Sequence, residues 1–141
     1  MELKKRILAK LEEMNQYLEE LEEFLPAGEE GYVENKQVRR ACEKTIELAV
    51  EAVISIISLI VSHNKLGIPK NEDDLINLLE KKKIITSLLA ATLKEMKGFR
   101  NILVHRYAEV DDAIAYRTLA EQVGDFSRFE QEIHKYLQTL K

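Results

Sequence analysis

The sequence contains few of the residues that make turns, disulfides or cysteine-based metal sites. Its 141 residues include one cysteine, two prolines, five glycines and no tryptophan. The single cysteine, Cys42, excludes an internal disulfide and a zinc site built from several cysteines, and it suits a reducing cytoplasm. So few glycines and prolines argue against a fold of many short strands, and they favour an all-α protein.

The charge balance gives no global sign of nucleic-acid binding. The formal net charge is -4, so any basic site must be local. The N-terminal segment mixes both signs of charge and lacks the apolar core of a signal peptide. The longest apolar run, from Leu48 to Val61, is interrupted by Glu51 and is too short to span a membrane. We therefore expect a cytoplasmic protein without a membrane segment, folded as a single domain over residues 1–141.

Apolar residues recur at helical spacing in the first half of the chain. One stripe runs from Leu3 to Leu25, and Pro26 and Gly28 end that helix before a linker. A second helix is predicted from Asn35, a plausible N-cap, to about His63. Its middle is apolar on every side, which predicts the central helix of a bundle or part of a subunit interface.

The second half of the chain supplies two further helical patterns. Asn71 is expected to cap a short amphipathic piece, and a second stripe after the lysines at 81–83 continues to Leu103. A last helix is predicted to begin at Asp111 or Asp112 and to run to Leu140. Because the connections are short, we predict an antiparallel up-and-down four-helix bundle, with room for one short extra helix.

The stretch from Arg100 to Tyr107 gathers groups suited to phosphate chemistry at the end of the third pattern. Arg100 offers a fixed fork of donors that matches phosphate oxygens, and the imidazole of His105 is a group that can take up or deliver a proton. Such a pair can cleave RNA without a metal: the histidine deprotonates a 2′-hydroxyl and the arginine stabilises charge on phosphorus. The two residues converge if the helix loosens near Val104. Asn101 lies four residues before His105, on the same helical face.

A purely structural interpretation of this stretch is also open. Arg100 then pairs with a carboxylate such as Glu95 or Glu109, while His105 caps a helix C-terminus. The chain also carries a second His-x-Tyr pattern at His134, without an arginine five residues earlier, which indicates an ordinary helical surface. The three histidines are far apart and lack clustered ligands at familiar spacing, so no metal or other cofactor is predicted.

The pattern Arg100-Asn101-x3-His105-x-Tyr107, preceded by Gly98-Phe99, resembles the signature of the HEPN superfamily. The resemblance is strongest to the HepT toxins that pair with a minimal nucleotidyltransferase antitoxin. It covers nearly the whole chain, since the size, the helical content and the position of the motif all fit.

This resemblance implies a role for each motif residue. Arg100 and His105 match the pair that cleaves RNA, with tRNA as one candidate, and Asn101 matches a supporting polar position. Tyr107 matches the tyrosine that the antitoxin modifies by AMPylation, which silences the toxin. The family also implies a homodimer whose two motifs face one cleft. Glu51 receives no role from the resemblance; it is predicted either in a salt bridge or at the rim of a polar site.

Two features leave a second function open. Because the net charge is negative, RNA would have to contact a local set, which consists of Lys94, Lys97, Arg100 and Arg106. The chain has no nucleotidyltransferase signature of its own, so AMP transfer requires another protein. The alternative is a non-catalytic HEPN module that binds a nucleotide or a nucleotidyltransferase partner.

Overall fold

The computed structural model describes residues 2–105 and 110–140, and every regular element within these ranges is a helix. Four helices are long: α1 (Glu2–Phe24), α3 (Lys36–His63), α5 (Ser87–His105) and α6 (Asp112–Gln138). Two are short: α2 (Glu29–Val33) and α4 (Glu72–Lys81). The predicted all-α fold class is confirmed.

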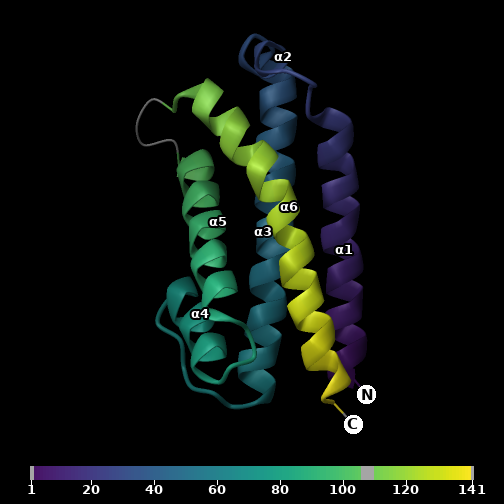
Figure 1. The fold of residues 1–141 in the computed structure, drawn as a ribbon, viewed down its shortest axis with the longest axis vertical. Helices are drawn as coiled ribbons and strands as arrows, with labels where there is room; N and C mark the ends of the chain where they lie inside the picture. The colour runs from purple at the N-terminus through teal and green to yellow at the C-terminus, as the bar shows by residue number, and fades with distance from the viewer. Residues whose placement is uncertain (1, 106–109, 141) are drawn as a thin grey trace.

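The four long helices run in alternating directions (Figure 1). α3 packs against both α1 and α5, and α6 crosses the bundle in front of α3. The short α2 lies at the upper end, against the beginnings of α3 and α6, and α4 lies at the lower end, where it packs against α3 and α5. The beginning of α1 and the end of α6 lie close together at the lower end.

Side chains cap the beginnings of three helices at the positions that the sequence indicated. The Oδ1 atom of Asn35 accepts a hydrogen bond from the backbone N–H of Val38 at 3.1 Å, and Asn71 accepts one from Asp74 at 2.9 Å. For the last helix, the sequence left two choices, and the structure uses Asp111 as the cap. Each cap satisfies backbone donors that no helical carbonyl reaches, which typically contributes about 1 kcal/mol.

One connection differs from the sequence prediction and another agrees with it. The expected linker after Pro26 contains the helix α2, because Tyr32 is buried and its ring lies 5.5 Å from the ring of Tyr116 on α6. The short piece after Asn71 and the stripe after the lysines are α4 and α5, separated by a turn in which Lys83 adopts a φ of +60°. Tertiary packing therefore adds one short helix, α2, that helical periodicity alone did not locate.

The helix α3 forms the centre of the hydrophobic core. Ile46, Val53, Ile56 and Ile57 are among its fully buried side chains. By length and composition, α3 is apolar enough to cross a membrane, but 56% of its most apolar window is buried by the rest of the fold. Core helices of globular proteins have the same composition. Burial also raises the pKa of the Cys42 thiol to about 11, which keeps it protonated near neutral pH.

Truncating one of these core side chains is expected to destabilise the whole bundle. Ile57→Ala should lower the free energy of unfolding by about 3 kcal/mol, since it removes buried contacts and leaves a cavity. Ile68, which is 97% exposed, supplies the matched control, and Ile68→Ala should change stability by less than about 0.5 kcal/mol. Urea unfolding followed by circular dichroism measures both values. Equal values for the two variants would contradict the central position of α3.

Candidate active site

The helix α5 presents one face to the core and carries the polar motif at its C-terminal end. Leu93, Met96 and Leu103 are buried along that face. Arg100 is buried with them, at 8% exposure. A buried arginine needs partners for its charge and its donors, because desolvation of an unpaired guanidinium is costly.

Two acceptors hold the guanidinium of Arg100. Its Nε donates a hydrogen bond to Oδ1 of Asn101 at 2.9 Å. Its Nη2 donates to Oε1 of Glu72, the first residue of α4, and forms an ion pair with it. The carboxylate partner is therefore Glu72 rather than the nearby Glu95 suggested by sequence spacing, while Glu109 lies outside the described residues. The side chain of Arg100 is 9% exposed and that of Glu72 is 35% exposed.

A second ion pair joins the same two helices. Lys97 Nζ lies 2.8 Å from Oδ1 of Asp73, the next residue of α4. The first turn of α4 carries Glu72, Asp73 and Asp74, the sign of charge that the helix dipole favours at an N-terminus. In the fold it also faces the cations of α5. Sequence reasoning missed Glu72 as a site residue, and the acidic turn after the Asn71 cap was the only signal that pointed to it.

His105 is the last residue of α5 and is exposed. The helix does not loosen near Val104, so Arg100 and His105 remain five helical positions apart, about 140° around the axis. The structure thus leaves Arg100 on the buried face and His105 on the solvent side. Asn101 is partly buried beside Arg100, and Tyr107 lies outside the described residues.

The segment after the motif meets a firmly anchored helix. Asp111 caps α6, and the hydroxyl of Tyr116 in its second turn donates a hydrogen bond to the carbonyl oxygen of Pro26 at 2.8 Å. Arg117 adds an ion pair to Glu29 at 3.1 Å. The start of α6 is therefore fixed to the α1–α2 connection.

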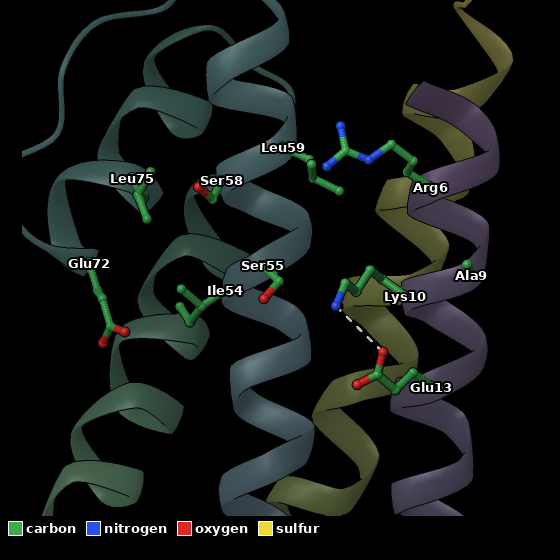
Figure 2. A pocket seen from close by; sticks show the side chains of 10 residues that line it. All are labelled: Arg6, Ala9, Lys10, Glu13, Ile54, Ser55, Ser58, Leu59, Glu72 and Leu75. Carbon is green, nitrogen blue, oxygen red and sulfur yellow. Dashed lines mark ion pairs between the residues drawn. The ribbon is translucent and has the colours of Figure 1, made fainter. Parts of the chain in front are cut away.

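A groove of about 680 Å³ lies beside Glu72, the ion-pair partner of Arg100 (Figure 2). Arg6 and Lys10 extend into it from α1, and Ser55 and Ser58 line it from α3. Glu72 belongs to its wall on the α4 side, so the groove and the buried ion pair share one carboxylate. Lys10 pairs with Glu13 at 3.5 Å, so the groove carries charge of both signs.

The structure also shows where Glu51, the second His-x-Tyr pattern and the candidate metal ligands lie. Glu51 is exposed on α3, outside the core. In the second His-x-Tyr pattern, His134 lies 3.2 Å from Glu130 on the surface of α6, and the Tyr136 hydroxyl accepts a hydrogen bond from Asn64 at 2.9 Å. Among the described residues, no group of three or more histidine, cysteine or acidic side chains is placed to hold a metal ion.

An all-α bundle whose fifth helix ends in an arginine, an asparagine and a histidine is the architecture of HEPN-type proteins. The chain belongs to the ribonuclease HepT-like family, whose model matches residues 14–133. This membership confirms the HepT-like resemblance and the ribonuclease class that the sequence predicted. The matched residues include the whole motif and also Glu72 on α4.

Three similar proteins illustrate this relationship. An mRNA nuclease HepT from Shewanella oneidensis is 36% identical over 84 residues, which cover 60% of this chain and just under two thirds, 63%, of that protein. A tRNA nuclease HepT from Aphanizomenon flos-aquae is 27% identical over 135 residues, 96% of this chain and 92% of that protein. The structure of a tri-AMPylated HEPN toxin from Shewanella oneidensis in complex with an MNT antitoxin superposes with a TM-score of 0.85 at 26% identity, covering 92% of this chain and 96% of that one.

Proposed function

We propose that this chain is the toxin of a HepT/MNT toxin–antitoxin pair and cleaves RNA without a metal. The observation that carries the proposal is the HepT-like family match, which includes the motif from Arg100 to Tyr107. The similar proteins act on mRNA in one case and on tRNA in the other, so both are candidate substrates. We further propose that residues 1–141 act as a single domain in the cytoplasm.

The motif residues supply the two functions that metal-independent RNA cleavage needs. His105 takes the proton from a ribose 2′-hydroxyl, and the 2′-oxygen then attacks the adjacent phosphorus. The bond from phosphorus to the 5′-oxygen breaks, the 5′-oxygen takes up a proton, and a 2′,3′-cyclic phosphate remains. Arg100 stabilises the charge that builds up on the phosphoryl oxygens during this step. Asn101 supports the site because its amide oxygen accepts from Nε of Arg100.

A homodimer completes the proposal. Within one chain, Arg100 and His105 lie about 140° apart on a continuous helix, which does not direct both at one phosphate. Two copies that bring their α5 ends together would supply both groups to one cleft. Exposed apolar side chains on this part of the helix, Ile102 and Val104, support such a contact.

The remaining partner is a nucleotidyltransferase antitoxin. The similar Shewanella toxin is tri-AMPylated and is bound to an MNT antitoxin. By analogy, we propose that the cognate antitoxin of this chain transfers AMP to Tyr107. This step forms a phosphodiester bond to the phenol oxygen and releases pyrophosphate from ATP. The added negative charge then lies seven residues after Arg100, beside the proposed catalytic pair.

Incubation of the purified chain with RNA tests the proposal directly. Total tRNA and an mRNA transcript should both be examined, and cleavage should leave a 2′,3′-cyclic phosphate and a 5′-hydroxyl. Excess EDTA should leave the rate within about twofold, because protein groups alone carry the acid–base chemistry. If EDTA abolished RNA cleavage and added Mg²⁺ restored it, the metal-independent mechanism would be wrong. Binding of the nucleotidyltransferase without cleavage of either RNA would instead support the non-catalytic HEPN module.

A further inference from the structure

We propose that Glu72 is a positioning residue for this reaction, because it holds the Arg100 guanidinium in the orientation that receives the scissile phosphate. The inference rests on the proposed ribonuclease activity and adds a residue from outside the motif. Glu72 lies 28 positions before Arg100 in the sequence, at the start of another helix. It would act on the substrate only through Arg100.

The burial of Arg100 explains why it needs a carboxylate partner. Its side chain is 9% exposed and lies on the same face of α5 as Met96 and Leu103. In such surroundings an unpaired guanidinium would be strongly destabilised or would turn toward solvent. The ion pair with Glu72 compensates the buried charge, so the guanidinium of Arg100 stays charged and stays on the buried face of α5.

The hydrogen-bond donors of Arg100 that Asn101 and Glu72 leave unused determine from which side a phosphate can bind the guanidinium. Nε is occupied by Asn101 and one hydrogen of Nη2 by Glu72, so two acceptors from different helices fix the plane of the group. Among the described residues, no acceptor occupies Nη1 of Arg100. The Nη1 donors and the second hydrogen of Nη2 therefore form a remaining edge, which matches two oxygens of a phosphate.

Glu72 is itself held in place and can be reached from solvent. The Asn71 cap fixes the first turn of α4, and the Asp73–Lys97 ion pair ties that turn to α5. Glu72 is 35% exposed and lines the groove of Figure 2, so the Arg100–Glu72 pair lies at the edge of an open surface. A phosphate approaching along this edge meets an arginine that is already oriented, which is the condition for fast reaction.

Kinetics of three Glu72 variants and one control test this role. Glu72→Ala should lower kcat about 100-fold while KM changes less than about threefold, because a misplaced guanidinium mainly affects the transition state. Glu72→Asp should also lower kcat, since the shorter carboxylate reaches Arg100 poorly. Glu72→Gln keeps an oxygen acceptor but not the charge that the buried guanidinium needs, so it should recover only part of the kcat lost in Glu72→Ala. Added acetate should partly rescue Glu72→Ala.

Asp74→Ala is the matched control for charge. Asp74 lies in the same first turn, and its carboxylate accepts from the backbone N–H of Lys70 instead of from α5. This variant should keep wild-type kcat. Melting temperatures of all four variants show whether a loss of rate is a loss of folded protein, and Glu72→Asp serves if Glu72→Ala does not fold.

The outcomes separate this inference from the proposed function. If the wild-type chain cuts no RNA, the proposed function fails. If the wild type is active and the folded Glu72→Ala and Glu72→Asp variants keep its kcat, the positioning role is wrong. An increase in activity would also overturn it, because Glu72 would then compete with the phosphate for Arg100. A kcat loss that is shared by Asp74→Ala would assign the effect to the general charge of the turn.

Discussion

RNA cleavage is expected to fall by about 1000-fold when either Arg100 or His105 is replaced with alanine. The histidine variant loses the base that takes the 2′-proton, and the arginine variant loses the charge that stabilises the phosphorane. Because the two groups act in one step, the double variant should be little worse than either single variant. Initial rates on an end-labelled RNA, with matched protein concentrations, measure all three values.

Two controls separate chemistry from folding. Arg100→Ala also removes the partner of Glu72, so its stability must be measured beside its rate. Arg100→Lys keeps a positive charge but loses the planar fork, and it should remain folded with a rate at least about tenfold below wild type. His134→Ala, in the second His-x-Tyr pattern, should cut RNA at the wild-type rate, since His134 pairs with Glu130 on the surface of α6. Wild-type rates in both Arg100→Ala and His105→Ala would reject the assignment of the active site.

AMPylation of Tyr107 is expected to abolish cleavage almost completely. Co-expression with the cognate nucleotidyltransferase should add about 329 Da per AMP to the peptide that contains Tyr107, the increment of a covalently attached AMP. The new phosphodiester carries negative charge and bulk beside the motif, so it would repel the RNA backbone and compete for Arg100. Intact-protein and peptide mass spectrometry, together with the RNA assay, give the modification and its effect on the same sample.

A phenylalanine variant tests the residue assignment. Tyr107→Phe lacks the hydroxyl that receives AMP, so it should remain unmodified and active in the presence of the nucleotidyltransferase. The peptide that contains Tyr136 is the internal control, because that tyrosine follows the second histidine pattern and its hydroxyl is bonded to Asn64. AMP found elsewhere in the chain, with Tyr107 unmodified, would move the regulatory site to another residue.

The candidate active site could be predicted from the sequence only in part. The motif and its family were identified from the residues 100–107, since they lie close together in the chain. The pairing of Arg100 could not be identified in this way. Spacing suggested Glu95 or Glu109, whereas the described partner is Glu72 on another helix. Which carboxylate reaches a buried arginine depends on how two helices pack, and helical periodicity within one segment contains no such information.

The sequence by itself determined the local features of this protein. Helical propensity, apolar stripes and capping side chains act over a few residues. The all-α class, the caps at Asn35 and Asn71, a last cap at Asp111 or Asp112, and the position of the motif at a helix end could therefore be predicted. The tertiary structure alone decided which face of α5 holds Arg100, that Glu72 is its partner, and that a groove opens beside that pair. These features arise from contacts between segments far apart in the chain, where burial and charge pairing determine which residues meet.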